Sequence, residues 1–195
     1  MNIAFLLLAA GASTRMGRKD KLLQIVDGEP LVRTMARRAL DATTPVMVTL
    51  PLPGTARRDA LSGLDVTMVD VPDAAEGMAA SIRRGITACQ GADAILIQPT
   101  DMPDLQTSDF RTILKTAWAH PRNIIRATDA NGTPGHPVAF PADTFADLAK
   151  LKGDQGARPV LTANADRIRS VPLPGLRATT DLDTPRAWEN WRRGQ

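Results

Sequence analysis

Short apolar stretches recur along the first half of the chain and alternate with stretches of helical periodicity. Strands are expected at residues 3–10, 46–50, 65–71 and 94–97. The unbroken apolar run at 3–10 is typical of a strand that is buried on both faces of a parallel sheet. Apolar periodicity predicts helices at residues 30–42, 55–61 and 78–89. Alternating strands and helices indicate βαβ units, so we expect an α/β fold with a largely parallel sheet.

The second half of the chain has a different pattern. A helix is expected from Thr107 to about His120, with its start capped within Thr107-Ser108-Asp109. The turn signal Asp129-Ala130-Asn131-Gly132 lies between two apolar stretches, which predicts a small antiparallel excursion near residues 123–140. No repeat, low-complexity segment or long linker divides the chain. We therefore expect a single domain over residues 1–195.

Composition narrows the class of protein. The chain has 195 residues, of which 43% are hydrophobic and 23% charged, as in a globular protein with a substantial core. Its longest apolar run is far shorter than the ~20 residues that span a bilayer, so we expect no membrane segment and no signal peptide. The single cysteine, Cys89, excludes an internal disulfide. We expect it to be a buried, inert thiol, and the protein to be cytoplasmic.

The charge pattern gives no indication of nucleic-acid binding. There are 24 basic and 21 acidic residues, which gives a net charge of +3. This balance, without a basic stripe or exposed aromatic pattern, argues against a nucleic-acid partner. Arginine pairs such as Arg57-Arg58 are expected to lie mostly on solvated helix faces, although any beside an anion site could steer an anionic substrate there.

The stretch from Leu8 to Lys21 carries the clearest chemistry. A buried strand ends in Gly11 and a loop of small and cationic residues that includes Arg15 and Gly17. Glycines bring backbone amides close to a ligand, and two fixed cations add charge, which together favour a polyphosphate cradle. The spacing fits neither a Walker loop nor a dinucleotide fingerprint. The alternative is an ordinary glycine-rich turn between a strand and a helix.

The same stretch resembles a known signature. The pattern L-A-A-G-x-S-x-R-M-G, a lysine four residues on, and Gly28-Glu29-Pro30-Leu31-Val32 are similar to nucleotidyltransferases that load a nucleotide onto molybdopterin. The chain is more similar to the molybdenum cofactor cytidylyltransferases than to the guanylyltransferases, which usually read L-A-G-G at Ala9-Ala10-Gly11. This resemblance implies a Rossmann-like nucleotidyltransferase fold with a mostly parallel, three-layer sheet.

The resemblance also implies a set of nucleotide-binding residues. In the loop these are Leu8, Ala9, Ala10, Gly11, Ser13, Arg15, Gly17 and Lys21. A second segment, from Glu76 to Gly85, resembles the family's G-M-x-x-S-L-x-x-G and adds Gly77 and Ser81 along the base and sugar. The alternative for this second segment is a helix start whose small residues permit close packing.

Aspartates are expected to bind Mg²⁺. Asp101 follows the strand at 94–97, and a carboxylate at the carboxyl end of a parallel strand lies where such sheets bind ligands. Asp101-Met102-Pro103 matches the family's metal motif, although Gln98-Pro99-Thr100 before it departs from the usual L-G-D. Asp181 and Asp183 lie in a segment that resembles the family's D-x-D-T-P, although Arg186-Ala187 follow where relatives have Glu-Asp. Asp183 is expected as a second ligand. Two alternatives are open: Asp181 could be the second ligand instead, and Asp183 could cap the helix that follows.

Three residues are expected on the acceptor side. His136 lies in Gly135-His136-Pro137, which matches the family's G-x-P segment, and Asp154 and Arg158 lie in a segment similar to G-D-x-G-A-R. The alternatives are a structural histidine in a turn and an ordered loop. On this reading residues 1–105 form mainly the nucleotide-binding half and residues 106–195 mainly the acceptor-binding half.

These expectations define one reaction and several alternatives. CTP would transfer CMP to the phosphate of the molybdopterin cofactor and release pyrophosphate, with Arg15, Lys21 and Asp101 as the catalytic residues and Mg²⁺ as the cofactor. Cations must offset the repulsion between two anionic phosphates, and no side-chain nucleophile is required. The alternatives are guanylyl transfer from GTP to the same cofactor, cytidylyl transfer to another small phosphate, and a non-catalytic nucleotide- or cofactor-binding chaperone. A molybdoenzyme or its maturation chaperone is a possible protein partner.

Overall fold

A seven-stranded sheet forms the centre of the molecule. We describe the chain from a computed structural model that covers residues 1–17 and 19–194; Arg18, within the expected phosphate loop, and Gln195 lie outside the described residues. The strand order is β5-β4-β1-β6-β8-β7-β9. The strands are β1 (Ile3–Leu8), β4 (Val46–Pro51), β5 (Thr67–Val71), β6 (Ala94–Pro99), β7 (Ile124–Thr128), β8 (Pro134–Pro141) and β9 (Ile168–Pro172).

Only one strand of this sheet runs against the others. β8 is antiparallel to both of its neighbours, β6 and β7, whereas every other pairing in the sheet is parallel. The predicted α/β fold with a mostly parallel sheet is therefore confirmed, as is the antiparallel excursion near residues 123–140. A separate two-stranded sheet is made by β2 (Ile25–Val26) and β3 (Glu29–Pro30).

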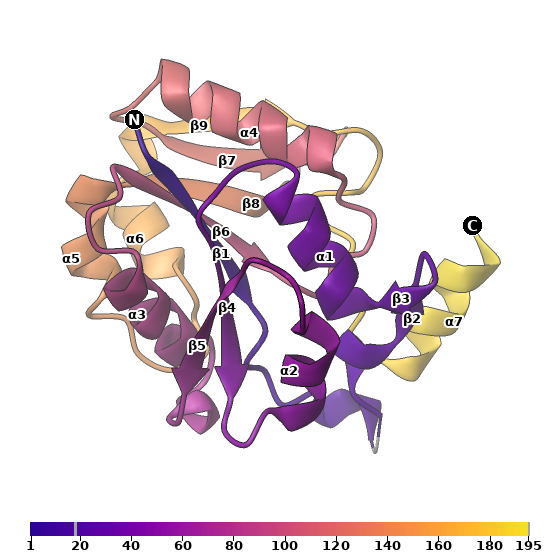
Figure 1. Cartoon of the computed structure of the whole chain (residues 1–195). Coiled ribbons are helices and arrows are strands. Elements are labelled where there is room, and N and C mark those ends of the chain that lie inside the picture. The colour runs from indigo at the N-terminus through magenta and orange to yellow at the C-terminus, as the bar shows by residue number, and fades with distance from the viewer. Residues whose placement is uncertain (18, 195) are drawn as a thin grey trace.

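Helices cover both faces of the large sheet and make three layers (Figure 1). One face packs against α1 (Leu31–Leu40) and α4 (Thr107–Ala119), whose buried side chains join those of Phe5 and Leu7 in one core. The other face packs against α3 (Met78–Ala88), α5 (Phe145–Leu148) and α6 (Arg158–Ala163), around Leu6 and Ile97. Successive residues of β1 alternate between the two cores because strand side chains alternate between faces. The remaining helices are α2 (Thr55–Leu61) and α7 (Pro185–Arg193).

Several predicted boundaries need correction. The first helix begins at Leu31, because Pro30 belongs to β3. The helix expected from Thr107 is confirmed, but Gln106 is the residue before it, and the Asp109 carboxylate accepts the Gln106 N–H at 2.9 Å. The helices α5 and α6 and the strand β9 were not predicted. They are short, and β9 is only partly covered, so its residues show no continuous apolar run.

Two further expectations concern burial and membranes. Cys89 is buried at the end of α3, as predicted, and burial raises the pKa of its thiol to about 12, which suppresses the reactive thiolate. Within residues 1–17 and 19–194, every helix is too short or too polar to cross a bilayer.

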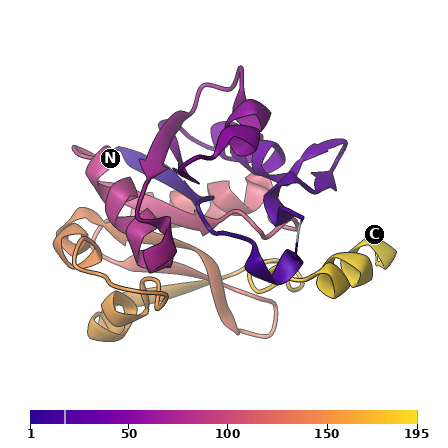
Figure 2. The same cartoon turned by 90° about the horizontal axis from the view of Figure 1, so that it is seen from below.

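The carboxyl ends of β1, β4 and β6 meet at one edge of the sheet. The loop after β1, the segment after β6 and the chain before α7 all come together there, as the view from below shows (Figure 2). Leu182 N–H donates to the Asp101 carbonyl at 3.0 Å and fastens the last of these segments to the second. This edge is where open α/β sheets bind their ligands.

Candidate active site

A cavity of about 560 Å³ opens at this edge, between the loop after β1 and the start of α3. Most of the residues expected to bind a nucleotide line it, namely Leu8, Ala10, Gly11, Ser13, Arg15, Lys21, Gly77 and Ser81. Ala9 and Gly17 are not among its lining residues, and the Ala9 side chain packs into the core on the opposite face of the sheet. Asp101 and Asp183 also line the cavity, which brings both expected metal ligands to the expected nucleotide site.

The loop after β1 folds back on itself through Ser13. This residue has a left-handed backbone, with φ of 54°, and precedes the 3-10 turn Thr14–Met16. Its hydroxyl donates to Asp20 Oδ1 at 3.3 Å and accepts the N–H of Lys21 at 3.3 Å. Met16 is buried and joins the core beneath the loop. The Ser13 side chain therefore holds the shape of the loop.

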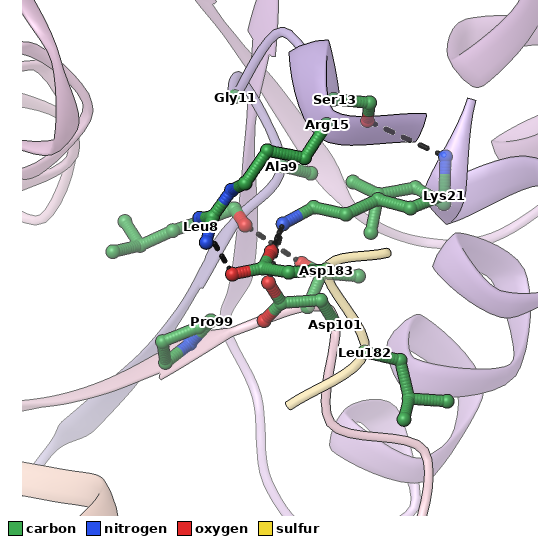
Figure 3. A network of polar contacts seen from close by, with 12 residues as sticks. Leu8, Ala9, Gly11, Ser13, Arg15, Lys21, Pro99, Asp101, Leu182 and Asp183 are labelled. Carbon is green, nitrogen blue, oxygen red and sulfur yellow. Dashed lines mark hydrogen bonds and ion pairs between the residues drawn. The ribbon is translucent and has the colours of Figure 1, made fainter. Parts of the chain in front are cut away.

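Lys21 connects two carboxylates that lie far apart in the sequence (Figure 3). Its Nζ donates to Asp101 Oδ2 at 2.5 Å and to Asp183 Oδ1 at 2.6 Å. Arg15 reaches the other oxygen of Asp183, with Nη2–Oδ2 at 2.6 Å. Burial acts to lower the pKa of the Lys21 ammonium, but the two carboxylates outweigh it and the pKa is raised. Lys21 is therefore a cation at neutral pH, in the wall of the cavity.

The segment before α7 presents its acids to this site. Thr184 caps α7 by accepting the Ala187 N–H at 3.1 Å, so the alternative in which Asp183 is the cap is wrong. Burial opposes ionisation of Asp183, but hydrogen bonding to Lys21 and the charge of Arg15 lower its pKa. Burial and the nearby carboxylates of Asp183 and Asp101 raise the pKa of Asp181. The two carboxylates lie close enough to interact, and Asp183 is the one that Lys21 and Arg15 hold ionised.

The donor set fits a hard divalent cation. Asp101 Oδ1 is buried and has no hydrogen-bond partner among the described residues, which leaves one carboxylate oxygen free to bind a ligand. Within residues 1–17 and 19–194 no group of three or more His, Cys, Asp or Glu side chains is arranged to hold a metal by itself. Mg²⁺ commonly binds through one or two carboxylates together with substrate phosphates and water. Asp101 and Asp183 match that incomplete type of site.

The start of α3 forms the opposite wall of the cavity. Gly77 has φ of 105°, a conformation that other residues rarely adopt, and a Cβ there would collide with Asp154 Oδ1. Asp154 Oδ1 accepts the N–H of Met78 at 3.3 Å, and the Gly153 carbonyl accepts the N–H of Ala79 at 3.1 Å. Asp154, expected on the acceptor side, therefore lines the cavity and accepts the first amide of α3, while the Gly153 carbonyl accepts the second.

His136 and Arg158 do not line the cavity, but α6, which begins at Arg158, packs on the same face of the sheet as α3. His136 lies within β8, so the interpretation as a turn residue is wrong. Burial and the charge of Arg126 lower the pKa of His136 to about 4, against the opposite effect of Asp101. Burial and the charge of Arg158 lower the pKa of Arg126, on β7. Among the described residues neither arginine forms an ion pair, so this face carries uncompensated positive charge.

Arg57 was not predicted as part of the site. Paired arginines were expected to lie mostly on solvated helix faces, yet only 6% of the Arg57 side chain is exposed, and its guanidinium group contacts the loop after β1. A usable signal was present in the sequence: consecutive helical residues point about 100° apart, so both arginines cannot face solvent equally. The structure decides which of the two contacts the loop, because α2 follows β4, the parallel neighbour of β1.

The comparison with known protein families identifies the chain. Residues 5–168 match the model of the MobA-like NTP transferase domain. The chain belongs to this family. It is therefore a nucleotidyltransferase, in agreement with the resemblance that the loop motif suggested.

The relatives act in molybdenum cofactor synthesis, with different nucleotides. The "Molybdenum cofactor cytidylyltransferase" of Escherichia coli is 24% identical over 181 residues, which cover 92% of this chain and 90% of that protein. The "Probable molybdenum cofactor guanylyltransferase" of Natronomonas pharaonis is 29% identical over 201 residues, with 95% of each chain covered.

A solved structure of similar fold is Rv0371c of Mycobacterium tuberculosis. It is 29% identical, with a TM-score of 0.80 and coverage of 99% of this chain and 96% of that one. A second structure of Rv0371c is a complex with manganese, at 27% identity and a TM-score of 0.78, covering 99% of this chain and 97% of that one.

Proposed function

We propose that this nucleotidyltransferase transfers CMP from CTP to the phosphate of a molybdopterin-type cofactor and releases pyrophosphate. The observation that carries the proposal is the network of Lys21, Arg15, Asp101 and Asp183, which lines the cavity together with the glycine-containing loop. Two cations and two carboxylates meet where a triphosphate would lie against backbone amides. This is the donor set that phosphoryl chemistry requires.

The triphosphate is held by the loop from Leu8 to Lys21 in this proposal. Gly11 has no atom near the position of a Cβ, so the backbone is accessible from the cavity at that point. The base and sugar extend along the start of α3, past Gly77 and the buried Ser81.

Charge compensation is the main work of the catalytic residues. An oxygen of the acceptor phosphate attacks the α-phosphorus of CTP, and the bond from that phosphorus to the bridging oxygen breaks as pyrophosphate departs. Lys21 and Arg15 neutralise the charge that develops on the α-phosphate and on the leaving group. Both side chains are already placed by Asp183, so little reorganisation is required during the reaction.

A divalent cation belongs to this proposal, with Asp101 and Asp183 as its protein ligands. When bound, Mg²⁺ would neutralise triphosphate charge beside Lys21. The free oxygen of Asp101 supports this role. So does the similarity to Rv0371c, one crystal structure of which is a manganese complex.

The preference for CTP rests on Ala10. Its methyl group lies at the end of β1, lines the cavity and packs with Val71 and Ala80. A pyrimidine fits beside this methyl group more readily than a purine, and one such clash is worth about 1–3 kcal/mol, or roughly 10- to 200-fold discrimination. GTP is the alternative, since the family relatives include both kinds of transferase. Replacing Ala10 by Gly should reduce the preference for CTP over GTP.

The acceptor is placed next to Asp154, toward β7 and β8. Asp154 lines the cavity, and His136, Arg158 and Arg126 extend from it along the same face. Two arginines that have no carboxylate partner among the described residues, beside an uncharged histidine, are suited to a phosphate monoester dianion. Residues 1–105 are thus mainly the nucleotide-binding half of one domain and residues 106–195 mainly the acceptor half. Replacing Arg126 by Met should raise the KM for the acceptor and leave CTP binding unchanged.

The cellular setting follows from the chemistry proposed. The unpaired, buried thiol of Cys89 is compatible with the reducing cytoplasm, where we place the enzyme. The nucleotide-loaded cofactor must then pass to a molybdoenzyme or to its maturation chaperone, which is the protein partner that we propose.

Pyrophosphate release, measured with each nucleoside triphosphate in the presence and absence of molybdopterin, tests the function. Release with CTP that depends on molybdopterin supports the proposal, and release with GTP alone supports the guanylyl alternative. Nucleotide binding without any release would identify the protein as a carrier of nucleotide or cofactor. Release that depends instead on a sugar phosphate or isoprenoid phosphate would identify a different acceptor.

A further inference from the structure

Arg57 contacts both ends of the phosphate loop from outside the cavity. At the start of the loop, Nη1 donates to the Ala9 carbonyl at 2.5 Å and Nη2 donates to the Gly11 carbonyl at 2.8 Å. At the end of the loop, Nε donates to Asp20 Oδ2 at 2.7 Å and Nη2 to Asp20 Oδ1 at 2.9 Å. One guanidinium group therefore ties together residues that precede and follow the turn.

These contacts fix the direction in which the loop amides point. In a trans peptide the N–H points opposite to the C=O of the same peptide unit. The carbonyls of Ala9 and Gly11 turn toward Arg57, so the N–H groups of Ala10 and Ala12 turn away from it. Both Ala10 and Ala12 line the cavity. Arg57 thus orients two amide donors to point away from itself, as a bound phosphate would require.

The same guanidinium also acts on Lys21 through Asp20. Asp20 Oδ1 accepts the Leu22 N–H at 2.9 Å and so holds the turn that begins at Lys21. The hydroxyl of Ser13 contacts both Asp20 and Arg57, and it accepts the Lys21 N–H. Arginine suits this position, because its planar fork donates in several fixed directions at once and lysine offers only a point charge.

We propose that Arg57 is a positioning residue, which holds the phosphate loop in its binding conformation without contacting the substrate. This inference rests on the proposed function, in which the loop binds a triphosphate. Arg57 is not among the residues that line the cavity, so its role in binding would be indirect.

The chain offers a matched control in the next residue. Arg58 lies on the same helix and pairs with Asp70 of β5, away from the loop. Replacing Arg57 or Arg58 by Met removes the same charge and the same donors from adjacent positions. Only the change at Arg57 removes contacts with Ala9, Gly11 and Asp20.

Calorimetric binding of inorganic tripolyphosphate and of CTP tests the inference separately from catalysis. We expect Arg57→Met to bind both ligands about 10- to 100-fold more weakly, since a displaced loop loses several amide contacts at once. Arg58→Met should bind within about twofold of wild type. Guanidinium ion at a concentration that does not denature the protein should restore part of the binding to Arg57→Met and change nothing in Arg58→Met. Simple loss of stability would not produce that rescue.

Each outcome decides a different claim. Wild-type affinity in a folded Arg57→Met protein overturns the positioning role and leaves the proposed function standing. Failure of the wild type to bind tripolyphosphate overturns the phosphate cradle, and the role of Arg57 with it. If Arg57→Met does not fold, Arg57→Lys gives the answer. Lysine keeps a positive charge for Asp20, but it lacks the guanidinium donors that reach the carbonyls of Ala9 and Gly11. Wild-type affinity in Arg57→Lys would then contradict the inference.

Discussion

At the scale of single residues, the site is an arrangement of charges that balance each other before substrate arrives. Lys21 and Arg15 share Asp183, and Lys21 also holds Asp101. Such half-buried pairs contribute little net stability, because desolvation offsets much of their attraction. Their value is in placement, since each cation is already fixed where anionic phosphates would arrive.

Lys21 is the most direct single-residue test of this arrangement. We expect Lys21→Ala to lower the turnover number by about 100-fold or more, because one lost transition-state cation costs a few kcal/mol. The variant should remain folded by circular dichroism. Lys19, which is exposed in the same loop, provides the control, and Lys19→Ala should retain its rate. A normal turnover number for folded Lys21→Ala would remove this residue from the catalytic set.

The carboxylates should set the dependence on a divalent cation. Asp101→Asn is expected to abolish Mg²⁺-dependent activity, and Asp183→Asn to weaken it, because a hard cation requires carboxylate oxygens. Asp181→Asn should reduce the activity less than Asp183→Asn does, because Asp181 is the less readily ionised of these two acids. Initial rates measured over a titration of Mg²⁺ compare the three variants. Activity that persists undiminished in EDTA would contradict the metal mechanism.

His136 should make the stability of the protein depend on pH. Its pKa is about 4 in the folded protein and 6.5 in an unfolded chain, so the unfolded state binds the proton more readily. The stabilising contribution is complete above pH 6.5 and is lost as the pH falls toward 4. Urea unfolding between these values should show a decreasing free energy of unfolding, and His136→Gln should flatten that part of the curve. Equal slopes for the two proteins would show that His136 is not the group responsible.

At the scale of elements, the sequence pattern located the buried strands and the longer helices well. β1, β4, β6, α3 and α4 all lie where apolar runs or helical periodicity predicted them. Each of these elements buries a whole face, so its pattern is strong. The elements that the pattern missed, such as β9 and α6, pack only partly against the core and keep charged residues.

The residues of the site also divide into those that the sequence could predict and those that it could not. The glycine loop and Asp101 could be predicted because a buried strand leads directly into each of them. Helix geometry indicates that Arg57 and Arg58 differ in exposure, but the sequence does not show which of them contacts the loop, since that depends on the strand order that sets α2 beside it. Long-range juxtaposition of this kind is not encoded in local periodicity. The start of α7 is different, because Thr184 followed by Pro185 is a helix-start signal in the sequence itself.

The contact between Gly77, at the start of α3, and Asp154 can be tested by adding a single methyl group at Gly77. Gly77→Ala should destabilise the protein by about 1–3 kcal/mol, because it adds strain at positive φ and displaces the Asp154 carboxylate. It should also weaken CTP binding. Gly91→Ala is the control, since Gly91 also has positive φ but has open space around it. If both variants lose the same stability and neither loses CTP affinity, the contact with Asp154 has no role in binding.

At the scale of the whole molecule, the sheet arranges two kinds of surface along one edge. The parallel strand β1 leads into the loop that ends at Lys21, β4 leads to α2 and Arg57, and β6 leads to Asp101. The antiparallel β8 and its partner β7 carry His136 and Arg126 toward the same edge. This continuity supports a reaction between two bound anions, one on each side of the charged network.

The central claim is that this enzyme joins a cytidylyl group to a molybdopterin phosphate. The direct measurement supplies CTP and GTP together in equal amounts, with molybdopterin and Mg²⁺. In one reaction the α-phosphate of CTP is labelled, and in a second reaction that of GTP. We expect the label from CTP to appear in a product that contains molybdopterin, in amounts that exceed transfer from GTP by at least about tenfold. Preferential transfer from GTP would contradict the cytidylyl assignment. Absence of label from any molybdopterin product, with either nucleotide, would contradict the proposed reaction itself.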